Sequence, residues 1–212
     1  GGIFPSHMSV IDMFGQPKMT YYYTRRAYED FLVCCTEKKD AFRIHACSEL
    51  TEEIKGTLHI THMDFKGKVI LEKSMACTAA ADSTTLLAEF PGCTFAVKDK
   101  YEEYFRIRFD TSGCEYENRY FFADICEINR LKLPPAGLRI RKASFEDGNI
   151  RLYLYTENFA RSVRLRLSDR SAGFADNYFD MDSGIKKVRI ADGGPEGLYA
   201  RSIYEIGRSS VE

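Results

Sequence analysis

Alternation of apolar and polar residues recurs along this sequence and limits what the chain can fold into. Phe105, Ile107 and Phe109 alternate with charged residues, and the same pattern returns over residues 150–155 and 163–168. Successive side chains of a β-strand point to opposite faces, so a period of two places one face on a core and the other in water. The pattern therefore predicts antiparallel strands with one buried and one solvated face.

Turn signals separate these strands at short intervals. Clusters of Asp, Gly, Ser and Asn lie at residues 64–67, 111–113 and 146–149, and no helical pattern lies between the strands. Short strands with closely spaced turns are typical of β-sandwiches. We therefore expect an all-β fold.

Consecutive prolines mark the best domain boundary. Pro134 and Pro135 donate no ladder hydrogen bonds and stiffen the chain. We place a first sandwich at residues 30–130, a linker at 131–136 and a smaller second sandwich at 137–212. Residues 9–29 contain a helix, predicted at Met19–Tyr28 with Thr20 as its N-cap. Residues 1–8 are interpreted as an expression scar outside the fold.

Charge and cysteine content argue against several classes of function. The 30 Lys and Arg nearly balance the 31 Asp and Glu, which leaves no net field to attract nucleic acid or an anionic membrane. No apolar run approaches the roughly 20 residues of a transmembrane helix. The seven cysteines are odd in number and form no CxxC pair, and neighbouring Cys34 and Cys35 point to opposite faces. This usage favours free thiols in a reducing compartment and predicts a cytoplasmic protein.

Paired acids and histidines offer no convincing catalytic or metal site. The neighbours Glu52-Glu53 and Glu102-Glu103 point to opposite strand faces, and we interpret both pairs as solvated edges. His59 and His62 also face opposite ways, and His45 has no neighbouring ligand. No metal site is therefore predicted.

Two tyrosines form the candidate sugar platform. Tyr153 and Tyr155 are an outward pair on one strand, although the chain has no Trp to supply a larger ring. The stretch Asp176–Asp180 invites a calcium or sugar site, but Phe179 is at an inward position and Gly184 at a turn, so we interpret it as structural. Carbohydrate binding at the tyrosine pair stays open as an alternative function.

Two stretches in the first third of the chain resemble glycoside hydrolase family 2 enzymes. Ile11–Lys18, followed by Tyr21-Tyr22 and Arg25-Arg26-Ala27, is similar to the segment that leaves the catalytic (β/α)8 barrel of these enzymes through its last helix. Glu53–Leu58 and Met63–Val69 resemble the first sandwich after the barrel, where an Asp-Phe-x-Gly-Lys hairpin recurs.

A third stretch narrows the resemblance to the β-mannosidases of that family. Phe174–Met181, ending at Gly184, resembles the Ser-Asp-Asn-Phe-Phe-Asp-Leu-Leu-Pro-Gly run of their terminal immunoglobulin-like domain. Ala175 replaces Ser, and Asp182-Ser183 replaces Leu-Pro. The resemblance implies two consecutive immunoglobulin-like antiparallel β-sandwiches preceded by a short N-terminal helix, with the catalytic barrel absent.

The resemblance also implies a function. Family 2 enzymes are retaining glycosidases with two catalytic glutamates, one of which follows an Asn. This chain has no Asn-Glu dipeptide, so we predict no catalytic residue, cofactor or metal, and an architectural role in a β-mannosidase that cleaves terminal non-reducing β-mannosides. The expected partner is the catalytic barrel of the same chain. One stripe of the helix is expected to rest on the first sandwich. The alternative is a self-sufficient carbohydrate-binding module that binds an oligosaccharide.

Overall fold

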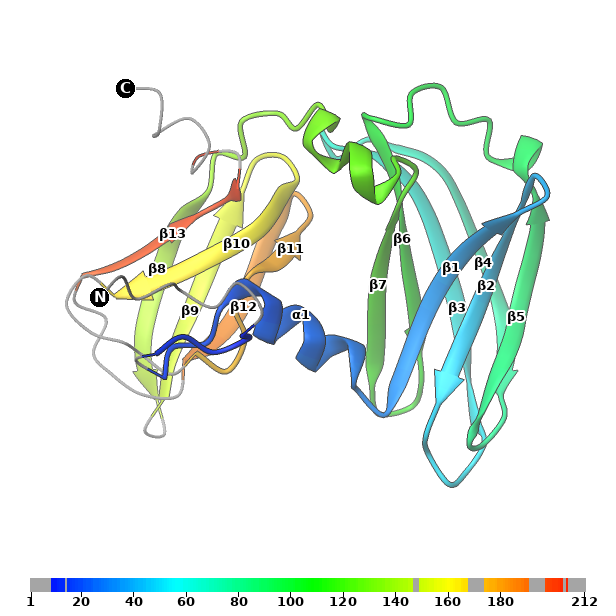
Figure 1. Ribbon diagram of the computed structural model, residues 1–212, viewed down its shortest axis with the longest axis horizontal. Coiled ribbons are helices and arrows are strands. Elements are labelled where there is room, and N and C mark those ends of the chain that lie inside the picture. Colours follow the sequence, from blue (N-terminus) through cyan, green and yellow to red (C-terminus); the bar gives the residue numbers. More distant parts are fainter. Residues whose placement is uncertain are drawn as a thin grey trace, which may run out of the picture. The chain divides into compact units, whose positions relative to one another are not determined.

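The chain folds mainly into antiparallel β-sheets, as the alternation predicts (Figure 1). The computed structural model describes residues 9–13, 15–146, 149–167, 174–190, 197–203 and 205. Two compact units make up the chain, one of residues 29–132 and the other of residues 1–28 together with 133–212. Within the described residues, no helix is long and apolar enough to cross a membrane.

The first unit is a sandwich of a three-stranded and a four-stranded sheet. The order in the smaller sheet is β1-β2-β5, and in the larger β4-β3-β6-β7. Two 3-10 helices follow strands of these sheets, η1 at Gly92–Thr94 and η2 at Ile125–Arg130. The strands are β1 (Phe31–Lys38), β2 (Ala41–Ser48), β3 (Ile54–Asp64), β4 (Val69–Ala79), β5 (Ser83–Pro91), β6 (Glu103–Asp110) and β7 (Glu115–Phe121).

The core of this sandwich follows the predicted alternation. Phe105, Ile107 and Phe109 of β6 are at most 1% exposed. Ile44 and Leu58, from the two facing sheets, are fully buried in the same cluster. The intervening residues of β6 are partly exposed, so the alternation correctly identifies the inward face.

The second sandwich consists of two three-stranded sheets. Their orders are β12-β9-β8 and β11-β10-β13. Leu152, Leu165 and Phe179 lie at the centre of the core between them. The strands are β8 (Arg139–Glu146), β9 (Asn149–Thr156), β10 (Ala160–Leu167), β11 (Phe179–Met181), β12 (Gly184–Ile190) and β13 (Leu198–Arg201).

The proline segment is fixed to the second sandwich by polar contacts. The carbonyl of Ala136 accepts hydrogen bonds from the Thr156 hydroxyl at 2.6 Å and from the Glu157 amide at 2.8 Å. Asn158 donates from its side chain to the carbonyl of Pro135. Gly137 follows with a φ of +62°, where a side chain would also meet Glu157. The approach to β8 is therefore built into this domain.

The helix α1 (Met19–Ala27) forms where the sequence predicts it, but the expectation about its N-cap is wrong. Its N-cap is Lys18, in extended conformation and held by a hydrogen bond from its amide to the carbonyl of Val10, so Thr20 lies inside the helix rather than at its cap. The helix makes polar contacts with the second sandwich, at Ser162 and residues 175–178.

Replacing Phe179 by Ala tests the core of the second sandwich. Phe179 is 4% exposed and packs with Leu165 and Met181, so the substitution should lower the free energy of unfolding by about 3–5 kcal/mol. Urea denaturation measures the loss. The control Ile185→Ala removes a side chain that is 69% exposed, and its midpoint should stay near that of the parent. An unchanged midpoint for Phe179→Ala would contradict this inward register.

Candidate functional site

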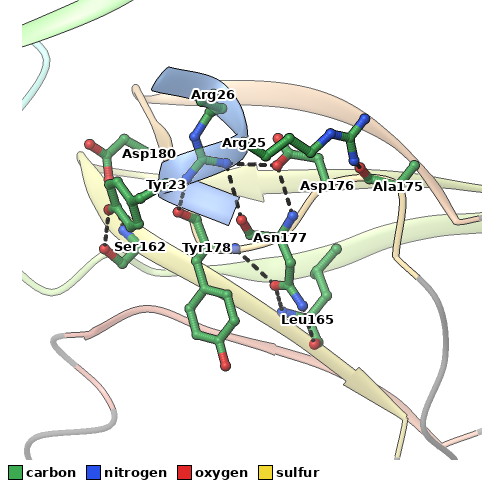
Figure 2. A network of polar contacts seen from close by, with 10 residues as sticks. All are labelled: Tyr23, Arg25, Arg26, Ser162, Leu165, Ala175, Asp176, Asn177, Tyr178 and Asp180. Carbon is green, nitrogen blue, oxygen red and sulfur yellow. Dashed lines mark hydrogen bonds and ion pairs between the residues drawn. The ribbon is translucent and has the colours of Figure 1, made fainter. Parts of the chain in front are cut away.

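The stretch Asp176–Asp180, which the sequence singles out, is a centre of polar contacts in the second sandwich (Figure 2). The buried amide of Asn177 accepts the N–H of Leu165 at 2.7 Å and donates to the carbonyl of Leu165 at 2.9 Å. The carboxylate of Asp180 accepts the amide of Ser162 at 2.8 Å. Tyr178 has a φ of +53°, in the left-handed region. The stretch is therefore structural, as we predicted, and is bonded to β10 through its side chains.

Two arginines of α1 bind the backbone that this turn exposes. Arg26 donates to the Asp176 carboxylate at 2.7 Å and to the carbonyls of Asn177 and Tyr178 at 3.2 and 2.9 Å (Figure 2). Arg25 donates to the carbonyl of Ala175 at 2.6 Å. We call Arg25, Arg26 and their acceptors at residues 175–178 the helix anchor.

Tyrosines complete the contact between α1 and the sandwich. The hydroxyls of Tyr23 and Ser162 share a hydrogen bond of 2.7 Å, and the guanidinium of Arg26 lies 4.8 Å from the ring centre of Tyr23. Tyr22 is 3% exposed, with its ring 5.8 Å from that of Tyr178. Burial raises the pKa of both Tyr22 and Tyr23, so both phenols stay neutral at physiological pH.

The sequence points to both halves of the helix anchor but not to the contact between them. Arg25-Arg26 and Phe174–Met181 were each noted for a resemblance, but 150 residues separate the contacting pairs. The local signal for this contact is the pair of adjacent arginines in the last turn of the helix, where the negative end of the helix dipole favours cations. Local patterns do not show which distant carbonyl groups accept the hydrogen bonds of these arginines.

Arg26→Ala tests the anchor. The side chain is 30% exposed, so solvent screening reduces the value of its ion pair, and we expect a loss of about 1–2 kcal/mol in the free energy of unfolding. Arg25→Ala, which removes a single exposed carbonyl contact, is the matched control and should change stability by less than about 0.5 kcal/mol. Urea unfolding followed by far-ultraviolet circular dichroism distinguishes the two variants. Equal effects would show that Arg26 has no special role.

Tyr153 and Tyr155 lie on the outer face of β9 and are half-buried. The guanidinium groups of Arg139 and Arg141 lie 5.1 and 4.6 Å from the ring centre of Tyr155, and the ammonium of Lys187 lies 5.7 Å from that of Tyr153. The rings are thus engaged by cations. Their role as a sugar platform stays a prediction.

A serine, a histidine and an aspartate meet on the outer face of the first sandwich. His59 Nδ1 is 2.8 Å from Ser74 Oγ, and its Nε2 is 3.3 Å from Asp110 Oδ2. A serine nucleophile needs hydrogen-bond donors aimed at the developing oxyanion. The same-face neighbours of Ser74 on β4 are Glu72 and Ala76, which supply no such donor, and Arg108, opposite His59 on β6, is paired with Asp110. We interpret the trio as a cross-strand polar contact.

His62 and Glu103 form a buried pair, and for Glu103 the solvated-edge interpretation is wrong. Glu103 is 6% exposed, and its carboxylate lies 2.8 Å from Nε2 of the fully buried His62. Phe95, Phe105 and Phe122 surround the imidazole. His59 and His62 do face opposite ways, as expected, and within the described part of the chain no three His, Cys, Asp or Glu residues form a group that could hold a metal.

Burial lowers the pKa of His62 and Glu103 partly opposes this, which gives a testable pH dependence. A histidine with a lowered folded-state pKa is protonated more readily in the unfolded chain, so stability falls as pH drops below the ordinary value of 6.5. We expect the unfolding free energy to fall between pH 7.5 and 5.5 with a slope of up to about 1.4 kcal/mol per unit. His62→Gln should remove this slope and His59→Gln should retain it. A pH-independent parent would contradict the assignment.

All seven cysteines are free thiols. Burial raises the pKa of Cys35 to about 12, and burial together with the neighbouring Cys47 raises that of Cys34 to about 11. These thiols therefore stay protonated and weakly nucleophilic at neutral pH.

Comparison with known families gives two matches that together cover most of both sandwiches. Residues 40–125 match a family model described as a mannosidase Ig/CBM-like domain. Residues 133–191 match a second model, named for mannosidases and described as an Ig-fold domain. No curated protein matches the chain.

Solved structures of glycoside-cleaving enzymes share the fold. β-D-mannosidase from Dictyoglomus thermophilum matches 92% of this chain with a TM-score of 0.76 and 23% identity, over 24% of its own length. The exo-chitosanase CsxA from Amycolatopsis orientalis matches 92% of this chain with a TM-score of 0.63 and 13% identity, over 29% of its length. The chain thus spans about a quarter of these enzymes. It belongs to the tandem immunoglobulin-like domains of mannosidase-type enzymes, a mannosidase Ig/CBM-like domain followed by an Ig-fold domain.

Proposed function

We propose that this chain is a non-catalytic accessory region of a family 2 glycoside hydrolase, whose parent is a β-mannosidase that cleaves terminal non-reducing β-mannosides with retention. The helix anchor is the observation that carries the proposal. By the resemblance, α1 corresponds to the segment that leaves the catalytic barrel. A helix fixed by Arg26 to three oxygens of the terminal domain suits a joint that holds that domain to the barrel.

Exposed apolar side chains beside α1 support a partner domain. Val10, Ile11, Met13 and Met19 are between 37% and 66% exposed, within ten residues of one another. Single exposed apolar residues are ordinary, whereas a group of them is typical of an interaction surface. The segment is ordered locally, since Asp12 accepts the amide of Gln16 and Ile11 forms a bridge with Pro17. We propose that the catalytic barrel of the same polypeptide covers these side chains.

Architecture is favoured over chemistry because, among the described residues, the acids singled out from the sequence are exposed or paired with a cation or an imidazole. Retention needs two carboxyl groups about 5–5.5 Å apart in a rigid site. Glu52 and Glu53 are exposed, Glu102 pairs with Lys132, and Glu103 is buried against His62. Glu102 also shares Lys132 with Asp99, so a cation holds both of these carboxylates. The raised pKa values of Cys34 and Cys35 also suit the proposed cytoplasmic location, where thiols stay reduced.

Carbohydrate binding is the second candidate function, and the outward placement of Tyr153 and Tyr155 favours it. Cations lie over both rings, however, and they compete with a neutral sugar for the ring faces. The architectural role therefore explains more of the structure.

The isolated chain should release nothing above blank from aryl β-mannoside or aryl β-galactoside, because the two catalytic glutamates are expected on the barrel. A continuous chromogenic assay at high protein concentration checks this. Turnover that survives repurification and is abolished by one Glu→Gln change would contradict the proposal. The reading frame upstream of Ile11 gives an independent test, since it should encode a barrel with an Asn-Glu dipeptide.

A further inference from the structure

The outer face of the β12-β9-β8 sheet carries a dense set of cations. Directly opposite residues of an antiparallel ladder share a face, so the register aligns outward side chains across all three strands. Arg141, at a bulge in β8, joins them with its guanidinium over Tyr155. We call this surface the basic face; its members are Arg139, Arg141, Lys142, Arg151, Lys187 and Arg189, with Tyr153 and Tyr155 at its centre.

The equivalent surfaces of the first sandwich are neutralised. Arg43 pairs with Glu89 across strands β2 and β5, and Arg106 pairs with Glu117 across β6 and β7. On the basic face, Glu157 pairs with Arg139 and the register puts Glu146 opposite Asn149 at the end of the same face, so six cations stand against two acidic positions. Mixed charges suffice to keep a sheet face in water, as the first sandwich demonstrates. The excess of positive charge on the basic face is therefore more than solubility requires.

The rings of Tyr153 and Tyr155 make cation–π contacts and so are not open platforms for stacking. Arg139 and Arg141 both lie within 5.1 Å of the ring centre of Tyr155, and Lys187 lies over Tyr153. Cation–π contacts of this kind restrict flexible side chains. A nucleobase or a neutral sugar binds aromatic rings by stacking and needs an uncovered face. The basic face therefore selects a ligand by charge.

We propose that the basic face binds an acidic polysaccharide, one whose repeating units carry carboxylates or sulfates. Outward residues repeat about every 6.6 Å along a strand, and neighbouring strands lie about 4.8 Å apart, so the cations form a regular grid. Such a grid matches the evenly spaced anions of an extended chain. That the ligand is a carbohydrate rests on the proposed function, whereas the preference for anions rests on the basic face alone.

Binding of the whole chain to polygalacturonate tests the proposal, with neutral mannan as the matched uncharged polymer. Titration in 50 mM and 500 mM NaCl should give binding to polygalacturonate that weakens strongly with salt, because the contacts are ionic and exposed. Mannan should not bind. Comparable mannan binding, or no polygalacturonate binding at low salt, overturns the proposal. The proposal is also overturned if a single-stranded oligonucleotide or poly-glutamate binds more tightly than polygalacturonate. The basic face would then prefer another class of polyanion.

Charge reversals locate the site. The triple change Lys142→Glu, Lys187→Glu and Arg189→Glu alters exposed side chains of the basic face and should weaken binding at least about tenfold. Lys38→Glu, Lys66→Glu and Lys68→Glu on the first sandwich make the same change in net charge and should leave binding within about twofold. Equal losses would overturn the assignment to this face.

Thermal melting checks that both triple variants fold. Lys187→Gln with Arg189→Gln is the milder pair, to be used if the reversal unfolds the domain. The glycosidase assay of the isolated chain does not involve these side chains, so failure of this inference and failure of the proposed function are separate results.

Discussion

The second sandwich depends on one buried amide. The side chain of Asn177 is 4% exposed and bonds both the N–H and the carbonyl of Leu165, on the edge of β10 where the short strand β11 no longer pairs. A buried backbone group left without a partner costs about 1–3 kcal/mol, so this amide takes the place of a missing strand residue. Its oxygen also accepts the amide of Tyr178, which fixes a turn with positive φ. That turn directs the carbonyls of Ala175, Asn177 and Tyr178 towards Arg25 and Arg26 (Figure 2).

The helix in turn depends on the turn that Asn177 fixes. The nine residues of α1 are fewer than the roughly 12–15 that an isolated helix needs even with good helix formers. Its N-cap makes no side-chain hydrogen bond, so docking supplies the stability through Tyr22, Tyr23 and Arg26. Because the anchor joins residues about 150 positions apart, α1 can dock in this way only once residues 175–178 have formed their turn.

Local pattern predicted those features that local sequence controls. Burial of Phe105, Ile107 and Phe109 follows from strand periodicity alone, and the limits of α1 agree with the prediction to one residue. The alternation also puts His59 and His62 on opposite faces of β3, but no local signal shows that Glu103, 41 residues later, is the partner of His62. Nor could it show that α1 would dock on the second sandwich. The error for Glu103 concerns a polar contact between distant segments, where spacing carries no information, whereas the N-cap error at Thr20 is local.

The net charge of the whole chain is an average over two units that differ in sign. Residues 29–132 contain 14 Lys and Arg against 19 Asp and Glu, whereas the remaining residues contain 16 against 12. The near balance of the whole chain therefore hides an acidic first unit and a basic second one. Charges are screened over about 8 Å at physiological ionic strength, which is shorter than either sandwich. A ligand bound at one face therefore experiences the charges of that face and not the net charge of the whole chain. Only mixing of both signs on the scale of a few side chains removes an attraction for anions. The first sandwich has such mixing at Arg106 and Glu117, whereas the six cations of the basic face outnumber its acidic positions, Glu146 and Glu157.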